Sequence, residues 1–190
     1  MENIKQIFKD SITLKQEILG DSIILNQIDE IIDILSNTLK SEKRVYLAGN
    51  GGSAADAQHL AAEFTGRFYI DRRAYPVEAL HCNSSYMTAV ANDYSYDVIY
   101  SRLVEGTLNQ GDILWLFSTS GNSVNIINAA KSALKKNIKV ISFTGIGGGK
   151  LKSFSDITVE IPSKITPRIQ ECHMIIGHII CELTEKKLSL

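Results

Sequence analysis

The most informative stretch of the chain reads RVYLAGNGGSAADA and runs from Arg44 to Ala57. Its first part, Arg44–Ala48, is a short and mainly apolar run that predicts a strand. The glycines that follow allow the backbone to approach a ligand closely, and the small residues after Ser53 favour the start of a helix. A strand, a glycine-rich turn and a helix form the repeating unit of a parallel α/β sheet. Such sheets bind ligands beyond the carboxyl ends of their strands, so this turn is a candidate binding loop.

Two interpretations of this turn remain open from its residues. Gly49, Gly51 and Ala54 fit the dinucleotide-binding pattern G-x-G-x-x-G/A, which often occurs by chance. The acidic residue expected about 20 positions further on is poorly matched, because Asp71 precedes the next strand instead of ending it. The alternative is a tight turn in which Ser53 caps the helix.

Four further apolar runs predict the rest of the sheet. They contain few alternating polar positions, which is typical of parallel strands buried on both faces. The predicted strands are Pro76–Leu80, Asp112–Phe117, Ile138–Phe143 and Ile157–Ile161. The sequence therefore predicts a doubly wound α/β fold, in which helices cover both faces of a parallel sheet.

Helices are predicted at both ends of the chain. Apolar residues recur at helical spacing over Ile4–Ile18 and Leu25–Leu39. Asp21 or Ser22 can cap the second of these helices. A last helix is expected from about Arg168 to Lys187.

Length and composition exclude several classes of protein. The 190 residues are 44% hydrophobic and 22% charged, which argues against a disordered, collagen-like or membrane protein. The 20 basic and 21 acidic residues leave a net charge of −1, so no positive field would attract nucleic acid or acidic lipid. We expect a single domain over residues 1–190, made of amino-terminal helices (1–41) and an α/β core (42–190).

Cysteine usage and the amino terminus suggest a location. Cys82, Cys172 and Cys181 are an odd number without C-x-x-C spacing, which fits neither a disulfide scaffold nor a thiolate zinc site. They suit a reducing cytoplasm. The first ten residues form no apolar run, and we expect neither a signal peptide nor a membrane span.

A second candidate binding loop, Ser118–Ser123, lies between a predicted strand and a helix expected at Val124–Lys135. Its four hydroxyl residues, glycine and asparagine would lie at a helix amino terminus, where free N–H groups and the helix dipole favour an anion. The loop contains no basic residue. We interpret it as a phosphate site built from neutral donors; the alternative is a single hydroxyl that caps the helix.

A third glycine-rich segment, Thr144–Leu151, resembles a nucleotide P-loop only superficially. The pattern G-x-x-x-x-G-K-[ST] needs glycine where Thr144 stands and Ser or Thr where Leu151 stands. We therefore expect a flexible loop there, without a nucleotide.

Histidines and carboxylates are grouped on two expected helices. His59 and Glu63 are four residues apart and project from one helix face, either as half of a metal site or as a surface pair. On the final helix, His173 and His178 lie on opposite sides of Gln170 at about 100° per residue, so only one of them should reach any single site. The spacing does not decide which. A histidine on an apolar face, as His178 is, is usually a core or interface residue.

Taken together, five motifs resemble those of the phosphoheptose isomerases, also called sedoheptulose 7-phosphate isomerases, which have the sugar isomerase (SIS) fold. The motifs are residues 48–59 (AGNGGSAADAQH), 63–67 (EFTGR), 91–94 (ANDY), 118–123 (STSGNS) and 168–173 (RIQECH) with His178. They occur in order over nearly the whole chain. The resemblance implies a five-stranded parallel sheet between helices, and a homotetramer with active sites between subunits.

The resemblance also implies roles for individual residues. The substrate is expected to be a phosphorylated seven-carbon sugar, and the cofactor one Zn²⁺ per active site. The residues expected to bind the substrate are Asn50, Gly51, Gly52, Glu63, Arg67, Asn92, Asp93, Ser118, Thr119, Ser120, Ser123 and Gln170. Those expected to hold zinc are His59, Glu63, Gln170 and His178, which leaves His173 in a supporting role. Glu63 and His178 are expected to be the catalytic acid/base pair.

The reaction that the resemblance implies converts sedoheptulose 7-phosphate to D-glycero-D-manno-heptose 7-phosphate. A proton moves between C1 and C2 through an enediolate, with zinc polarising the carbonyl. The product would serve surface heptose synthesis, for lipopolysaccharide or a capsule. The main alternative is a non-catalytic SIS protein that senses a sugar phosphate or binds a partner protein, and the third is a nucleotide-dependent oxidoreductase. The joint presence of the zinc residues and the acid/base pair favours the enzyme.

Overall fold

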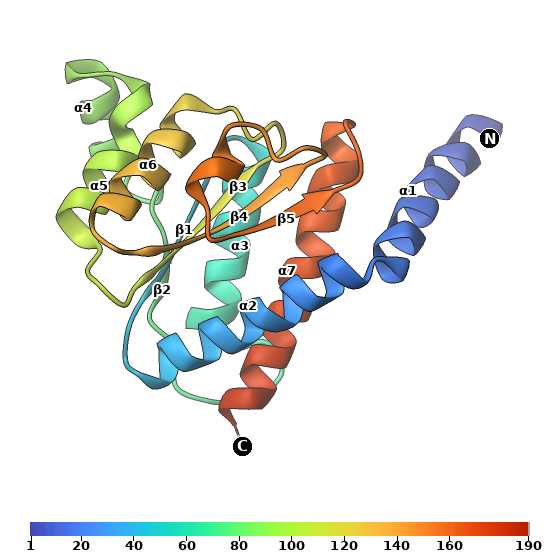
Figure 1. The fold of residues 1–190 in the computed structure, drawn as a ribbon, viewed down its shortest axis with the longest axis horizontal. Coiled ribbons are helices and arrows are strands. Elements are labelled where there is room, and N and C mark those ends of the chain that lie inside the picture. Colours follow the sequence, from blue (N-terminus) through green and yellow to red (C-terminus); the bar gives the residue numbers. More distant parts are fainter. Residues whose placement is uncertain (190) are drawn as a thin grey trace.

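A parallel sheet of five strands forms the centre of the computed structural model, which describes residues 1–189 (Figure 1). The strands are β1 (Val45–Gly49), β2 (Val77–Ala79), β3 (Ile113–Ser118), β4 (Lys139–Gly145) and β5 (Ile157–Ile161). Their order across the sheet is β2-β1-β3-β4-β5, and every neighbouring pair is parallel. The predicted fold class is therefore confirmed. Each predicted strand is present, with its ends at most about two residues from the prediction.

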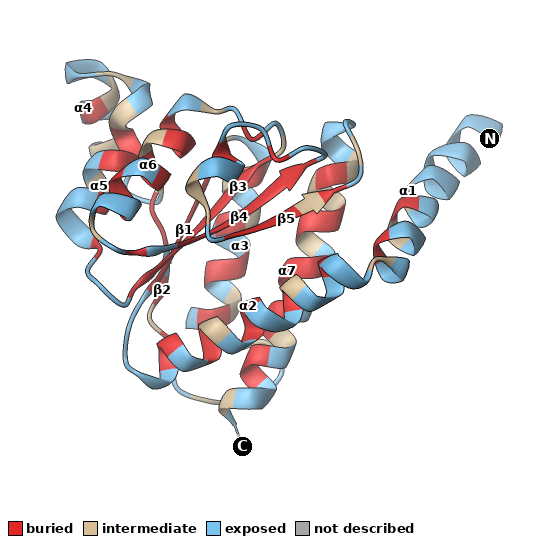
Figure 2. Ribbon diagram, in the orientation of Figure 1, coloured by how far each residue is buried: buried red, intermediate tan, exposed pale blue. Residues whose placement is uncertain are grey.

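Helices cover both faces of the sheet because the strands are apolar on both sides. One layer contains α2 (Ser22–Lys40), α3 (Gly52–Thr65) and α7 (Thr166–Leu188), and the other contains α4 (Ser84–Asp93), α5 (Ile99–Thr107) and α6 (Val124–Lys135). Alternate residues of β1 show the division, because Val45 and Leu47 pack into the first layer and Tyr46 and Ala48 into the second. All residues of β1 and β3 are buried, as the red strands of Figure 2 show.

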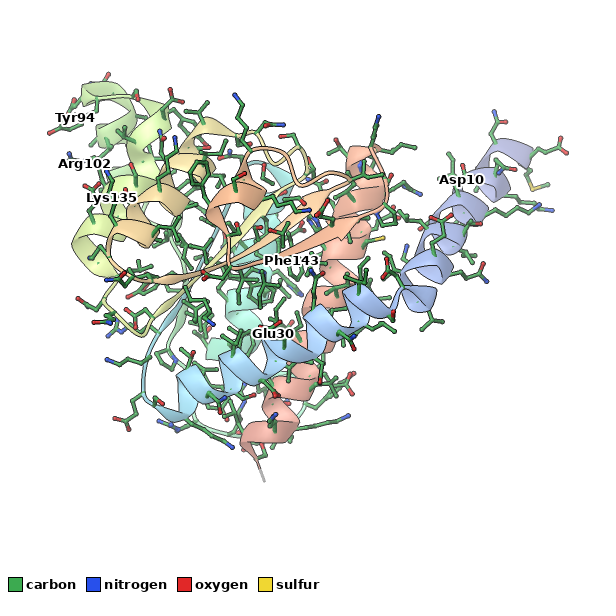
Figure 3. The ribbon with its side chains drawn as sticks, in the orientation of Figure 1. Asp10, Glu30, Tyr94, Arg102, Lys135 and Phe143 are labelled. Carbon is green, nitrogen blue, oxygen red and sulfur yellow. The ribbon has the colours of Figure 1, made fainter. Side chains whose placement is uncertain are left out.

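Three aromatic side chains form the centre of the first layer. Trp115, Phe117 and Phe143 are fully buried, and their ring centroids lie 5.2 to 5.3 Å apart. Phe143 is labelled in the middle of the molecule in Figure 3. Burial of one such side chain contributes about 1.5–3 kcal/mol relative to exposure. These rings therefore anchor the sheet against α7.

His173 of α7 lies inside this aromatic core. It is fully buried, and its Nε2 atom lies 3.2 Å from the carbonyl oxygen of Thr144. Its Nδ1 atom has no hydrogen-bond partner among the described residues. Burial lowers the pKa of His173 from 6.5 to about 4, because desolvation disfavours the charged imidazolium. His173 is a neutral core residue and not a metal ligand.

The free energy of unfolding should therefore fall as the pH is lowered from 6.5 to about 4. In this range the unfolded chain binds a proton at His173 that the folded chain excludes. The free energy of unfolding therefore falls by about 1.4 kcal/mol per pH unit, and by about 3 kcal/mol in all. Above this range His173 contributes no pH dependence. Urea unfolding of the wild type and of His173→Gln across the range measures the effect. The difference in stability between the two proteins should change with pH, and a constant difference would contradict a buried neutral histidine.

The first helix, α1 (Glu2–Gly20), projects away from the rest of the molecule and is drawn in blue in Figure 1. Only Leu14 and Ile18 of this helix are buried. Ile4 and Phe8 are more than half exposed, and Figure 2 shows most of α1 in pale blue. Asp21 supplies the cap of α2, because its carboxylate accepts hydrogen bonds from two N–H groups of the first turn.

Two short 3₁₀ helices, η1 (Tyr96–Val98) and η2 (Leu151–Phe154), complete the elements of the described residues. None of the helices within residues 1–189 has the length and hydropathy that crossing a bilayer would require.

Candidate active site and metal centre

Two imidazoles and one carboxylate converge between α3 and α7. His59 and Glu63 project from successive turns of α3, and His178 comes from the middle of α7. The Nε2 atom of His59 lies 2.9 Å from Nε2 of His178 and 3.2 Å from Oε1 of Glu63. One ligand atom from each of the three residues lies within 4.8 Å of the others. The pair predicted on one helix is therefore joined by a third group from a distant segment.

This cluster fits a divalent metal ion. One imidazole nitrogen offers either a proton or a lone pair, so Nε2 of His59 cannot satisfy both neighbours by ordinary hydrogen bonds. Two ligands that each lie about 2.0–2.2 Å from one small ion are separated by about 3–4 Å, which is close to the separations observed. Imidazole nitrogens and carboxylate oxygens are ordinary zinc ligands. The described residues thus contain a possible metal-binding group in His59, Glu63 and His178.

Gln170, expected as the fourth ligand, lies over the start of α3. A Cβ atom added at Gly52 would come within 2.5 Å of Nε2 of Gln170, so glycine leaves room for this side chain. Gln170 and Asp56 line the same surface depression of about 790 Å³. Oδ2 of Asp56 is buried without a partner among the described residues, and desolvation raises the pKa of Asp56 to about 6. No sequence pattern singled out Asp56.

The turn before α3 depends on glycine. Gly51 is the N-cap residue of α3 and has a φ of 56°, a left-handed conformation that side chains disfavour. No side chain of the described residues caps this helix. Ser53 is buried inside the first turn, so the alternative in which Ser53 caps the helix is wrong.

The serine loop, Ser118–Ser123, connects β3 to α6 and has the features of an anion site. The side chain of Ser123, the N-cap residue of α6, makes no hydrogen bond to the first turn of that helix. The hydroxyl of Ser123 lies 3.2 Å from that of Ser118, and the hydroxyl of Ser120 accepts a hydrogen bond from the N–H of Asn122 at 3.1 Å. The capping alternative is therefore wrong, and the positive end of the helix dipole is available to an anion.

The glycine-rich segment Thr144–Leu151 packs against the serine loop, a role that its sequence did not indicate. The N–H of Gly145 donates to the carbonyl of Thr119 at 3.0 Å, and the N–H of Leu151 donates to that of Gly121 at 2.9 Å. Gly121 has a φ of 62°, and a Cβ atom there would lie 2.0 Å from the backbone of this segment. These contacts shape the serine loop, where the sequence suggested only a flexible connection.

Paired amides join the glycine loop after β1 to the serine loop. The two loops leave the same end of the sheet, since β1 and β3 are neighbours and Gly49 pairs with Phe117. Nδ2 of Asn50 donates to Oδ1 of Asn125 at 2.8 Å, and Nδ2 of Asn125 donates to Oδ1 of Asn50 at 2.9 Å. Asn125 is 3% exposed. Sequence reasoning missed Asn125 because it lies inside a helix and belongs to no motif.

Two predicted substrate residues stand apart from the metal-binding group within one chain. Asn92 and Asp93 end α4, which packs over the opposite face of the sheet from α3 and α7 (Figure 1). Nδ2 of Asn92 donates to the carboxylate of Asp93 at 2.9 Å. Arg67 is exposed just beyond α3 and takes part in no hydrogen bond or ion pair between residues of the described part of the chain.

A buried ion pair connects the carboxyl end of α3 to that of α7. The carboxylate of Glu185, with a side chain 1% exposed, accepts from three consecutive N–H groups, those of residues 68–70, and from Nε of Arg72. The terminal nitrogens of Arg72 donate to four main-chain carbonyls at and beyond the end of α3. Burial opposes ionisation, but these donors hold the pKa of Glu185 below its ordinary value. The loop so fixed places the Phe68 ring 5.8 Å from that of His178.

The fold and this site together define a SIS-domain protein, and a SIS domain family model matches residues 11–145. The chain is 47% identical over 185 residues to the phosphoheptose isomerase of Clostridium acetobutylicum, covering 97% of this chain and 94% of that relative. The chain belongs to the phosphoheptose isomerase family and is an aldose–ketose isomerase. The predicted resemblance is confirmed.

Two solved structures agree with this assignment. The phosphoheptose isomerase from Neisseria gonorrhoeae has a TM-score of 0.91 and 36% identity, with 97% of this chain and 98% of that chain covered. The phosphoheptose isomerase from Francisella tularensis has a TM-score of 0.93 and 31% identity, with 97% of each chain covered.

Proposed function

We propose that the protein interconverts sedoheptulose 7-phosphate and D-glycero-D-manno-heptose 7-phosphate, for the synthesis of surface heptose in lipopolysaccharide or a capsule. The observation that carries this proposal is the convergence of His59, Glu63 and His178 within 4.8 Å, between two helices of a phosphosugar isomerase fold. The names of the relatives support the seven-carbon substrate.

The serine loop is proposed to hold the phosphate. Ser118, Thr119, Ser120 and Ser123 belong to the loop that leads into α6, whose N-cap residue Ser123 makes no side-chain hydrogen bond to the helix. The hydroxyl of Ser120 already accepts a hydrogen bond from the N–H of Asn122, which leaves its own proton to donate to a phosphate oxygen. Neutral donors at a helix amino terminus suffice to bind a dianion. Asn50, Gly51 and Gly52 follow the adjacent strand and are proposed to contact the sugar chain.

Glu63 and His178 are proposed to be the acid/base pair. An aldose–ketose exchange needs one group to move a proton between C1 and C2 through the enediolate, and another to move the proton on the oxygen. A carboxylate and an imidazole within a few ångströms of each other supply these two groups. A carboxylate has two oxygens, so Glu63 can ligate a metal through one and accept a proton through the other.

His59, Glu63, Gln170 and His178 are proposed to hold one Zn²⁺. When bound there, the ion would supply a Lewis acid that polarises a carbonyl oxygen. The donor set suits zinc, since a neutral amide oxygen is a weak ligand that substrate oxygens can supplement. The three free cysteines support a cytoplasmic location for this chemistry.

A time course of the purified protein with sedoheptulose 7-phosphate, followed by NMR or mass spectrometry, tests the proposed function. We expect heptose 7-phosphate to form in the zinc-loaded protein, formation to stop after chelation, and added zinc to restore it. The circular dichroism spectrum of the chelated protein is the control for folding. Binding of the sugar phosphate without conversion under any condition would favour a non-catalytic sensor, and full activity after complete metal removal would contradict the zinc site.

Four copies of the chain are proposed to assemble, with active sites between subunits. A 19-residue helix that buries only two residues is not expected to be stable alone, so the apolar residues of α1 support a covering subunit. Phe8 of α1 lines the same depression as Gln170 and Asp56, which supports a subunit contact beside the site. The exposed positions of Arg67, Asn92 and Asp93 also support sites completed between chains.

Sedimentation equilibrium is expected to give about four times the chain mass of 21.0 kDa. Replacing Phe8 with aspartate places a charge on the apolar surface of α1, so it should lower the measured mass and reduce turnover together. Replacing the already polar Gln6 of the same helix with aspartate is the matched control. A monomeric wild-type protein with full activity would contradict this arrangement.

A further inference from the structure

Three side chains from separate segments form a hydrogen-bonded chain at the carboxyl end of β1. They are Asn125 of α6, Asn50 of the glycine loop and Tyr96 of η1. The two amides bond reciprocally at 2.8 and 2.9 Å, and the hydroxyl of Tyr96 donates to Oδ1 of Asn50 at 3.2 Å. Asn125 is 3% exposed, whereas Tyr96 is 52% exposed. The chain thus runs from the protein interior to the surface where the substrate is expected.

The direction of every hydrogen bond in this chain follows from one main-chain group. The N–H of Ile126 donates to Oδ1 of Asn125 at 3.0 Å, which fixes the orientation of that amide. Nδ2 of Asn125 must then face Oδ1 of Asn50, and Nδ2 of Asn50 must face Oδ1 of Asn125. An amide oxygen only accepts, so the hydroxyl of Tyr96 has to donate to it.

The donors and acceptors that these three side chains leave unused are therefore defined. Because the Tyr96 proton is used, its oxygen can only accept from a further group. Asn50 keeps one N–H that is not used in the pair with Asn125. An acceptor and a donor side by side match the two roles of a sugar hydroxyl, which both donates and accepts.

A nearby tyrosine shows what a purely structural role looks like. The hydroxyl of Tyr100 donates to the main-chain carbonyl of Gly49 at 2.5 Å, and Tyr100 is 1% exposed. Burial raises the pKa of Tyr100 well above its ordinary value. Tyr96, in contrast, donates its hydroxyl hydrogen bond to the side chain of Asn50, which belongs to the expected sugar site. About half of the surface of Tyr96 is exposed to solvent.

We propose that Tyr96 is a substrate-binding residue, whose hydroxyl accepts a hydrogen bond from a hydroxyl group of the sugar chain. This inference rests on the proposed function, because it takes Asn50 as a sugar contact. The phosphate is held at the amino terminus of α6, and Asn125 lies in the first turn of that helix. A sugar phosphate bound at the serine loop would therefore have Asn50 beside its carbon chain, and Tyr96 is hydrogen-bonded to Asn50.

Replacing Tyr96 with phenylalanine tests the proposal, because it removes one oxygen from a half-exposed ring. We expect KM and the Kd of sedoheptulose 7-phosphate to rise about two- to tenfold, with kcat nearly unchanged, since a hydrogen bond made equally in ground and transition states is lost. The inhibition constant of inorganic phosphate should stay the same, because the serine loop is untouched. Calorimetry measures the Kd of the sugar phosphate. The phosphate inhibition constant of the variant is compared with that of the wild type.

Tyr94→Phe is the matched control. Tyr94 is 63% exposed, lies two residues earlier, and is stacked with Arg102 at 4.2 Å (both labelled in Figure 3). The KM of the Tyr94→Phe protein should equal that of the wild type. Asn125→Asp is the second variant, because it replaces the amide donor to Asn50 with an acceptor at constant size. It should raise KM more than Tyr96→Phe does.

The outcomes separate the two proposals. An active wild type together with an unchanged KM and Kd in Tyr96→Phe overturns the role of Tyr96 alone. An equal rise in KM and in the phosphate inhibition constant overturns it as well, because the whole site is then disturbed. A wild-type protein that neither converts nor binds the sugar phosphate overturns the proposed function and this inference together. Binding without conversion overturns only the catalytic proposal, and the Kd values then decide the role of Tyr96.

Discussion

Replacing Glu63 with glutamine is expected to lower kcat by about 10²- to 10⁴-fold, the usual effect of losing a general acid/base group. Glutamine keeps the size of the side chain, and Glu63 is only partly buried, so the melting temperature should change little. The NMR or mass-spectrometric time course measures the rate. A fully active Glu63→Gln protein would remove Glu63 from the proposed acid/base pair.

Metal analysis separates the two proposed roles of Glu63. If the variant keeps its zinc and loses turnover, Glu63 acts in proton transfer; if zinc and turnover are lost together, it acts as a ligand. Glu182→Gln is the matched control, since Glu182 of α7 pairs with Lys186 on the exposed surface at 2.6 Å. That variant should be as active as the wild type.

Replacing Arg72 with alanine should lower the free energy of unfolding by about 3–5 kcal/mol, the usual cost of removing one partner of a buried ion pair. The side chains of Arg72 and Glu185 are 7% and 1% exposed, so Glu185 would keep a buried charge without its cation. The main-chain carbonyls of residues 63, 64, 66 and 73 would also lose a donor. Urea unfolding measures the change.

Two further variants check the cause of this loss. Lys186→Ala removes an exposed ion pair of α7 and should cost at most about 1 kcal/mol. A double variant, Arg72→Met with Glu185→Gln, removes both charges and should be more stable than the sum of the single changes predicts. A loss below about 1 kcal/mol in Arg72→Ala would show that the three main-chain N–H groups and water, and not Arg72, compensate the Glu185 carboxylate.

The strands could be predicted because each is a short apolar run with a glycine, serine or proline next to one of its ends. The helix Val124–Lys135 was predicted with the bounds that the structure has. The order of strands across the sheet and the division of helices into two layers depend on contacts between distant segments. The exposed face of α1 was not predicted, because its apolar spacing is the same whether the face packs inside the chain or against another molecule.

The residues of the candidate site could also be predicted only in part from the sequence. Helical spacing placed His173 and His178 on different sides of α7 but did not distinguish core from site. Packing against Phe117 and Phe143 buries His173, whereas His178 faces His59 across 2.9 Å. Tyr96 belongs to no sequence motif, and its hydrogen bond to Asn50 is formed only in the folded chain.

A main-chain N–H group, that of Ile126, fixes which groups donate and which accept among Asn125, Asn50 and Tyr96. This has an evolutionary consequence. Every amino acid except proline carries that N–H. Nearly all mutations at position 126 would therefore leave the order of donors and acceptors intact, and selection there acts only on the packing of a fully buried side chain. Divergence in sugar preference among descendants of this protein should accumulate at positions 50, 96 and 125, while position 126 varies only among residues that fill the same volume.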